Sequence, residues 1–439
     1  MEQQSYEYHS GSFMKKLNDY TLLLKDKIFK PIMIGGMGVD ISTEDLAIGA
    51  AKLGGIGHIS DAMCPYVCDK RLGTHFQNQK RSEFIAKLKS GFAEVAKWDV
   101  QATYEASKKY VSNVMSKKIG TGGIFINIME KLTMGDSLAN LKARICGALD
   151  GGIDGITLSA GLHNSSLKLF ENHPRFREVI LGTIVSSSRA LRIFLRSAKR
   201  ADRLPDYIVV EGPLAGGHLG FGKDWKDFEL KSLLREVLDY LKEEGLKIPV
   251  IPAGGIFTGK DAVEYMEQGA SAVQVATRFT ISKECGFPEE AKQAFLQSEE
   301  ADVEVNCSSP TGYLMRMLKS SPSLHSNAKP NCEALGYMLD DQGQCAYKTA
   351  YENAPVDATG EKLPISEKMC ICTHFMRSAC YTCGQYVYRL KETTLKLING
   401  KFYIPPMADI FNDYLYTADG SITLPIVSTE EDEKLLAVA

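Results

Sequence analysis

Between about residue 30 and residue 280, short apolar runs rich in Val and Ile alternate with longer segments that have helical periodicity. This alternation is typical of a parallel sheet whose strands are joined by crossover helices. There are eight such runs, and eight parallel strands close into a (β/α)₈ barrel, the α/β architecture called a TIM barrel. The predicted strands are Pro31–Gly35, Gly57–Ser60, Ile124–Met129, Gly155–Ser159, Val179–Val185, Tyr207–Glu211, Pro249–Ala253 and Ala272–Ala276.

The interval between the second and third predicted strands is much longer than a crossover needs, because a connecting loop usually adds only about 2 to 6 residues to its helix. Residues 61–121 therefore indicate a helical insertion in the barrel, which itself spans residues 28–285. Within the insertion, residues 81–98 and 104–115 have helical spacing of their apolar positions. We expect these helices to cap one end of the barrel.

The alternation of strands and helices stops after about residue 285, and Gly, Pro, Ser, Asn and Cys become frequent between residues 320 and 384. Residues 286–439 are therefore interpreted as a C-terminal segment on the substrate side, followed by a Cys-containing extension. Residues 386–397 are expected to be helical.

The composition is ordinary for a globular protein, with 24% charged residues and a formal net charge of −3. We therefore expect no nucleic-acid partner and no membrane partner. No apolar run reaches eighteen residues, and the first twelve residues are polar, which favours a cytoplasmic protein. The eleven cysteines are an odd number in a long chain, so reduced thiols are expected.

Two turns of small residues follow the seventh and eighth predicted strands, at Gly254-Gly255 and at Ala276-Thr277. In a (β/α)₈ barrel these loops are adjacent and form the usual phosphate site, because their free N–H groups and a helix dipole attract an anion. Either turn alone is an ordinary tight connection in about half of cases. Together, at this spacing, they predict a phosphorylated cofactor.

His218 is the candidate acid or base, because it follows a cluster of small residues at the end of the sixth predicted strand. An imidazole with an ordinary pKa of about 6.5 accepts or donates a proton near neutral pH. The small residues before it leave room for a flat ring. A histidine flanked by glycines is structural in roughly half of such cases.

These motifs resemble those of the nitronate monooxygenases, formerly called 2-nitropropane dioxygenases, and of the related FMN-dependent enoyl-ACP reductases. The resemblance covers roughly residues 28 to 320. It rests on five ordered motifs: Pro31-Ile-Met-Ile-Gly-Gly-Met-Gly, Phe125-Ile-Asn-Ile-Met, Ala215-Gly-Gly-His, Pro252-Ala-Gly-Gly-Ile and Ala276-Thr-Arg-Phe.

The resemblance implies FMN as cofactor and His218 as the active-site histidine. It places Gly35, Gly36 and Met37 along the flavin and gives Asn127 a hydrogen bond to its ring. It also puts Gly216 and Gly217 at the ribityl phosphate region, beside the turns at Gly254, Gly255, Ala276 and Thr277. The expected partner is a small-molecule substrate, a nitronate or an unsaturated acyl thioester, and a homodimer is left open.

Several other residues have no firm role at this level. Tyr313 and Arg316 lie in a segment where the family carries an arginine that closes over the substrate, but the spacing differs here. His58 and His163 follow or lie within predicted strands and are interpreted as structural. The group Cys370-Ile-Cys and Cys380-Tyr-Thr-Cys does not have a standard zinc or iron–sulfur spacing, and we expect no metal there.

Three function classes stay open. The first is a nitronate monooxygenase in which His218 deprotonates neutral nitroalkanes. The second is a NAD(P)H-dependent reductase of enoyl thioesters, although the chain has no separate dinucleotide fingerprint. The third is a barrel scaffold whose Cys-rich tail binds a partner, and the intact turn at His218 argues against it. A barrel of the inosine-phosphate dehydrogenase kind shares the phosphate turns, but its nucleophilic Cys loop has no counterpart here.

Overall fold

The computed structural model describes residues 14–79, 82, 86, 99–130, 132–133, 137–330, 337–338 and 345–427. The helix expected over residues 81–98 lies outside the described residues apart from positions 82 and 86, and so does Cys332.

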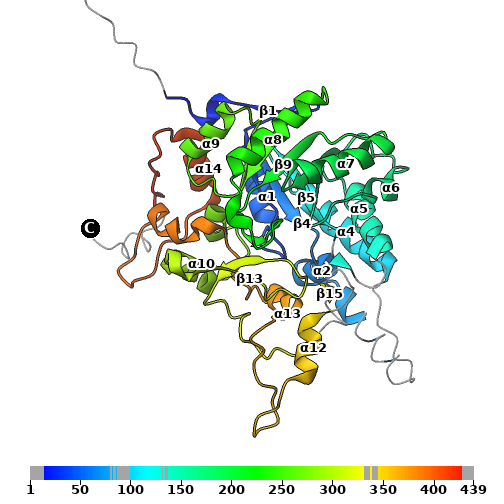
Figure 1. Ribbon diagram of the computed structural model, residues 1–439, viewed down its shortest axis with the longest axis vertical. Helices are drawn as coiled ribbons and strands as arrows, with labels where there is room; N and C mark the ends of the chain where they lie inside the picture. Colours follow the sequence, from blue (N-terminus) through cyan, green and yellow to red (C-terminus); the bar gives the residue numbers. More distant parts are fainter. Residues whose placement is uncertain are drawn as a thin grey trace, which may run out of the picture.

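The centre of the molecule is a closed barrel of eight parallel strands (Figure 1). Each strand begins and ends within one residue of a strand predicted from the sequence, so the expected fold class is confirmed. Around the barrel, β12 pairs with β3, which closes the sheet. The strands are β3 (Ile32–Ile34), β4 (Ile56–Ser60), β5 (Gly123–Met129), β7 (Gly155–Ser159), β8 (Ile180–Val185), β9 (Tyr207–Glu211), β11 (Val250–Ala253) and β12 (Val273–Val275).

Helices with one apolar face surround the barrel and bury that face against the strands (Figure 1). Their starts follow local capping chemistry. In α9, for example, the Thr258 side chain accepts from the Asp261 N–H while the Asp261 carboxylate accepts from the Thr258 N–H. The helices along the barrel are α1 (Glu44–Lys52), α2 (Cys64–Leu72), α4 (Val100–Ser116), α5 (Ser137–Asp150), α6 (Ser166–Phe170), α7 (Ser188–Arg200), α8 (Leu230–Glu243) and α9 (Gly259–Glu267).

Helix α4 confirms the helix expected over residues 104–115, but its expected position was wrong. It packs side by side with α5 on the outside of the barrel and does not cap an end. Thr103 donates to the Asn140 side chain, and Ser107 donates to the Arg144 carbonyl. Gly147 lets the two helices approach closely, because a Cβ there would lie 2.5 Å from the Tyr104 carbonyl oxygen. The apolar stripe of α4 therefore completes the outer ring.

The amino-terminal end of the barrel is closed by a hairpin of β1 (Leu22–Leu24) and β2 (Lys27–Phe29). Leu22, Leu24 and Phe29 are buried in one cluster with residues of the barrel interior, including Met33 and Phe125. Side chains of the hairpin thus fill the amino-terminal end of the barrel interior. The end formed by the carboxyl termini of the strands is where barrels of this kind bind their ligands.

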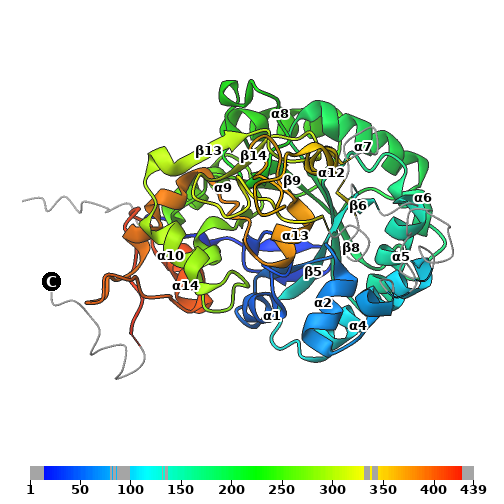
Figure 2. The ribbon, with the colours of Figure 1, turned by 90° about the horizontal axis from the view of Figure 1, so that it is seen from below.

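The C-terminal part of the chain lies across that open end. Its strands β13 (Val303–Asn306) and β14 (Met315–Leu318) form a three-stranded antiparallel sheet with β10 (Gly217–His218), and in Figure 2 the yellow and orange segments cover the middle of the ring. Strand β15 (Tyr337–Met338) pairs with β6 (Leu132–Thr133). The other elements after β12 are η3 (Thr277–Ile281), α10 (Glu289–Gln297), η4 (Glu300–Asp302), α12 (Ala346–Asn353), α13 (Ile371–Met376), η5 (Gln385–Thr393) and α14 (Met407–Tyr416).

Helix α14 packs against α1 and α9 and is joined to the barrel by a buried ion pair. The Arg278 guanidinium donates to the Asp413 carboxylate at 2.5 Å, and both side chains are at most 1% exposed. The guanidinium also lies 5.0 Å from the Tyr414 ring centroid. The helix expected over residues 386–397 is a 3₁₀ helix that ends at Thr393. Within the described residues, no helix has both the length and the apolar character needed to cross a membrane.

We expect Arg278→Met and Asp413→Asn each to lower the free energy of unfolding by about 3 to 5 kcal/mol, because each leaves its partner charged, buried and unpaired. The measurement is urea denaturation followed by circular dichroism. The control is Lys231→Met, which breaks a pair with Glu264 whose side chains are 49% and 41% exposed and should cost at most about 1 kcal/mol. A cost for Arg278→Met no larger than that of the control would contradict the role of the buried pair.

Candidate functional site at the carboxyl ends of the strands

All the site residues predicted from the sequence lie at one end of the barrel. Each follows a strand or lies within its last three residues, and the strands concerned are neighbours, because β9, β11, β12, β3, β4 and β5 are hydrogen-bonded in that order. The carboxyl ends of parallel strands meet at the same edge, so the fold brings these segments together. They are Gly35–Met37 after β3, Asn127 in β5, Gly216–His218 after β9, Gly254 and Gly255 after β11, and Ala276 and Thr277 after β12.

Gly36 and Asn127 are in direct contact across the mouth of the barrel. A Cβ on Gly36 would overlap the Asn127 side chain, and the Asn127 amide donates to the Gly36 carbonyl at 3.2 Å. The Ser159 hydroxyl donates to the Asn127 side-chain oxygen. Because an Asn amide has two N–H groups, one of them is left to meet a ligand.

Ser42, a residue that the sequence reading missed, fixes the loop after β3. Its hydroxyl accepts from the Met37 N–H at 2.8 Å and donates to the Gly35 carbonyl at 3.2 Å. The Ser42 N–H donates in turn to the Met37 carbonyl. The loop is therefore held in place by one buried hydroxyl, which no sequence motif marked.

The two-glycine turn after β11 requires glycine on conformational grounds. Gly254 and Gly255 have φ angles of +98° and +82°, in the left-handed region that other residues rarely adopt. A Cβ on Gly254 would also lie 3.0 Å from the Ala215 nitrogen. The turn thus keeps its backbone exposed to the mouth of the barrel while packing against the loop that leads to His218.

The C-terminal extension packs directly on the proposed phosphate turns. A Cβ on Gly384 would collide with the Thr277 hydroxyl, and a Cβ on Gly216 would lie 2.6 Å from the Cys383 carbonyl carbon. The Gln385 N–H donates to the Leu214 carbonyl at 3.1 Å. Residues far beyond the barrel in sequence are therefore part of the wall of the candidate site.

His218 is half-buried under the sheet of the C-terminal part. Its Nε2 lies 2.8 Å from the Ser309 hydroxyl, which lies 2.6 Å from the Thr311 hydroxyl. The Tyr313 ring meets the imidazole edge-on, with ring centroids 6.4 Å apart. Loss of solvation lowers the pKa of His218 from its ordinary value to about 4. The imidazole is therefore neutral at physiological pH and can accept a proton.

Arg316 is fully buried and hydrogen-bonds the loop that precedes His218. Its Nη1 donates to the Pro213 carbonyl at 2.7 Å and to the Ala215 carbonyl at 2.5 Å. The guanidinium stacks on Trp225, with its central carbon 4.6 Å from the ring. Burial lowers the pKa of Arg316 to about 10, so the group stays charged. Its place behind the loop makes it a support for the site.

Two polar side chains at the strand ends were not predicted. Ala253 is paired with both Glu211 and Gln274, so these two residues lie at one level of the barrel. Gln274 Oε1 is buried and has no hydrogen-bond partner among the described residues, and Gln274 lies against Gly35. Desolvation raises the pKa of Glu211 to about 7. An unpaired acceptor beside the predicted flavin loop is a position where a ligand N–H would fit.

The two other histidines singled out in the sequence, His58 and His163, have structural roles, as expected. His58 is inside the barrel, with Nδ1 2.7 Å from the Ile34 carbonyl and Nε2 2.6 Å from the Thr157 hydroxyl. His163 is fully buried between the Ser159 carbonyl and the Ser166 hydroxyl. Both rings use both nitrogens within the protein, so neither is available to a substrate.

Comparison with known proteins places this arrangement in a family. Residues 143–361 match the model of the family described as nitronate monooxygenase, and this range includes β7 to β14, His218 and both phosphate turns. The chain belongs to the nitronate monooxygenase family.

Curated relatives agree over shorter stretches. A probable nitronate monooxygenase of Staphylococcus saprophyticus is 28% identical over 187 residues, which are 41% of this chain and 46% of the relative. One from Staphylococcus haemolyticus is 32% identical over 105 residues, 23% of this chain and 28% of the relative. The chain thus aligns with less than half the length of these relatives.

Solved structures of this fold include FabK from Thermotoga maritima. That structure has a TM-score of 0.50 and 18% sequence identity, over 88% of this chain and 91% of that one, and its M276A mutant has a TM-score of 0.51 and 19% identity over 88% and 90%. At this identity the likeness concerns the fold alone.

The cysteine group of this family member consists of buried thiols. Cys370, Cys372, Cys380 and Cys383 are each less than 9% exposed, and desolvation raises the pKa of Cys380 to about 12. In the part of the chain that the structure describes, no three His, Cys, Asp or Glu side chains are grouped so that they could hold a metal. The expectation that this group is metal-free stays a prediction.

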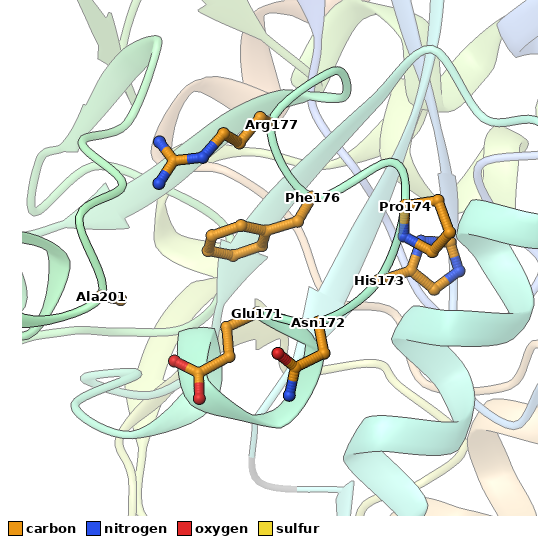
Figure 3. Close-up of a pocket in the computed structure, with 7 residues that line it drawn as sticks. All are labelled: Glu171, Asn172, His173, Pro174, Phe176, Arg177 and Ala201. Atoms are coloured by element: carbon orange, nitrogen blue, oxygen red, sulfur yellow. The ribbon is translucent and has the colours of Figure 1, made fainter.

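A cavity of about 450 Å³ lies between the segment that follows α6 and the end of α7, and Figure 3 shows the side chains that line it. Its residues belong to the loop that enters β8 and to the end of α7, both at the amino-terminal ends of strands. Two of its titratable groups have partners, since Arg177 meets Asp202 at 2.7 Å and His173 meets Asp150 at 3.2 Å. The lining residues are Glu171, Asn172, His173, Pro174, Phe176, Arg177 and Ala201.

We expect His218 to titrate with a pKa of about 4, well below the ordinary value of 6.5, because burial penalises the imidazolium. Between about pH 6.5 and pH 4 this histidine is protonated in the unfolded chain but neutral in the folded chain. Its contribution to the free energy of unfolding therefore decreases as the pH falls towards about 4. The measurement is NMR titration of the ring nuclei, with circular dichroism to confirm that the fold persists. A midpoint at 6.5 or above would contradict the assignment.

Proposed function

We propose that this protein is an FMN-dependent oxidoreductase of the nitronate monooxygenase type, which oxidises alkyl nitronates with oxygen. One observation carries the proposal: two features lie at the same end of a closed barrel. They are the neutral, half-buried imidazole of His218 and the turn of Gly254 and Gly255, which have positive φ angles. The first is suited to remove a proton and the second to bind a phosphate.

The residues present fit FMN. Gly254, Gly255, Ala276 and Thr277 would hold its phosphate in a cradle of backbone N–H groups. Both glycines have a positive φ, and a Cβ at either one would press on the loop of Leu214 and Ala215, so the turn requires glycine. Gly216 and Gly217 would lie beside that phosphate region.

The flavin ring would lie across the ends of β3 and β5. Gly35, Gly36 and Met37 would lie along it, and Asn127, whose amide donates to the Gly36 carbonyl, would give its second N–H to the ring. The unpaired oxygen of Gln274 beside Gly35 adds an acceptor for a ring N–H. These groups are the polar contacts that a planar, hydrogen-bonding ring requires.

When bound, FMN would accept electrons from the nitronate and pass them to oxygen. The chain's own contribution is proton removal and shielding. His218 is neutral and can take the carbon-bound proton of a neutral nitroalkane, which leaves the nitronate. The sheet of β10, β14 and β13 and the Tyr313 ring cover the imidazole, which limits the access of water.

The cofactor assignment predicts that Gly254→Asp and Gly255→Asp each abolish FMN retention, because the new carboxylate occupies the cradle and repels the phosphate. Flavin absorbance per chain after gel filtration measures this. The matched control is Gly245→Asp, which also replaces a glycine of positive φ but in open space, and it should retain flavin. If the Gly254 and Gly255 variants are folded and keep full flavin occupancy, the phosphate site is elsewhere.

The catalytic assignment predicts that His218→Asn keeps FMN but lowers kcat/KM for neutral nitroalkanes by about 10² to 10⁴, the usual contribution of a general base. A preformed nitronate should react almost as fast as with the unmodified enzyme, because its proton is already gone. His75→Asn, at an exposed histidine, is the control.

Two outcomes contradict this assignment. Full activity of His218→Asn on neutral nitroalkanes would make the residue structural. Rapid anaerobic reduction of the flavin by NADPH, followed by reduction of an enoyl thioester, would instead place the chain with the reductases.

A further inference from the structure

The two ring nitrogens of His218 have different environments. Nε2 lies 2.8 Å from the Ser309 hydroxyl, whereas Nδ1 has no hydrogen-bond partner among the described residues. Neutral imidazole carries its proton on one nitrogen and a lone pair on the other. Whichever nitrogen is unprotonated is the one that can act as a base, so the surroundings of Nε2 decide what Nδ1 offers to a substrate.

Ser309 is fully buried and has three polar neighbours. Besides His218 Nε2, it receives the Thr311 N–H at 3.2 Å and lies 2.6 Å from the Thr311 hydroxyl. A serine hydroxyl has one hydrogen and two lone pairs. All three contacts are satisfied if Ser309 accepts from the Thr311 N–H and from Nε2–H and donates its hydrogen to the Thr311 hydroxyl.

The reverse arrangement is less favourable. If Ser309 donated to Nε2, the proton of His218 would lie on Nδ1, where the described part of the chain offers no acceptor. In that arrangement the N–H of Nδ1 has only solvent as an acceptor, whereas in the first arrangement the N–H of Nε2 is bonded within the protein. The first arrangement leaves only a lone pair on Nδ1.

We propose that Ser309 is a positioning residue that holds the proton of His218 on Nε2, and that Thr311 fixes Ser309 in the orientation this requires. The proposal deepens the proposed function and rests on it, because it names the atom, Nδ1, that takes the substrate proton.

The proton step balances within these groups. The carbon-bound proton of the nitroalkane moves to Nδ1, the electron pair of the broken C–H bond stays on the substrate as the nitronate, and His218 becomes an imidazolium. Its Nε2–H then forms a charge-assisted hydrogen bond to Ser309, which is stronger than the bond to the neutral ring. Ser309 therefore stabilises the product of proton transfer more than the reactant, which is the condition for raising the rate.

The first test needs no turnover. The flavin-loaded full chain is labelled with [¹⁵N]histidine, and the signals of His218 are identified by their loss in His218→Asn. We expect an N–H type shift at Nε2 and a lone-pair type shift at Nδ1 at neutral pH. A protonated Nδ1 would overturn the proposal, whether or not the protein oxidises nitronates.

The second test uses a matched pair of variants. Thr311→Val removes the hydroxyl that orients Ser309, so Ser309 can turn to donate to Nε2, and the NMR signals should shift towards the Nδ1–H form. Thr311→Ser keeps the hydroxyl and should keep the original spectrum. Identical spectra for Thr311→Val and the unmodified protein would contradict the role of Thr311.

The third test is kinetic. Ser309→Ala should lower kcat for a neutral nitroalkane about ten- to hundredfold, the expected loss of one hydrogen bond to a charged group, and should leave a preformed nitronate within about twofold. Ser308→Ala, a neighbouring serine whose side chain has no hydrogen bond in the described structure, is the control. If Ser309→Ala lowers the rate equally with both substrates, Ser309 has only a structural role. If the unmodified protein is inactive on both substrates, the proposed function is refuted, and the NMR test of the proton position still applies.

Discussion

The buried pair of Arg278 and Asp413 is the constraint on which the geometry of the site depends. Arg278 directly follows Ala276 and Thr277, which form one of the proposed phosphate turns. Its guanidinium is buried, so its charge requires the Asp413 carboxylate as a partner. Two charges removed from water are tolerated only when their geometry is good and their other polar atoms are bonded. Asp413 meets this condition, because its second oxygen accepts from the Thr417 hydroxyl and the Thr423 N–H. The turn is thereby held in place from outside by the last helix of the described chain.

The C-terminal part is consequently a structural component of the site. Strand β14 pairs with the two residues of β10, which fixes the backbone of His218, and the Arg316 side chain of the same strand bonds the carbonyls before it. The residues from Cys383 to Gln385 pack on Gly216, Thr277 and Leu214. A barrel that ended near residue 285 would have the loops of the site without the contacts that shape them.

The sequence predicted the parts of this structure that depend on local pattern. Strand runs of Val and Ile gave all eight barrel strands within one residue, and glycines at Gly254 and Gly255 marked a turn that only glycine can form. Residues that act through tertiary contact left no such signal. Ser42, Gln274 and Ser309 are ordinary polar residues in sequence, and their roles arise because the fold brings them to Met37, Gly35 and His218. Helix α4 was predicted as a helix but misplaced, since periodicity indicates an apolar face and not the element that covers it.

The close contact between the extension and the glycine turns has a kinetic consequence. The backbone of Cys383 and Gly384 is packed on Gly216 and Thr277 with no room for even one further carbon atom. The hairpin of β1 and β2 fills the other end of the barrel. Local opening of the extension would therefore change the wall of the candidate site, so residues that never touch the reacting atoms would influence how fast a bound ligand leaves.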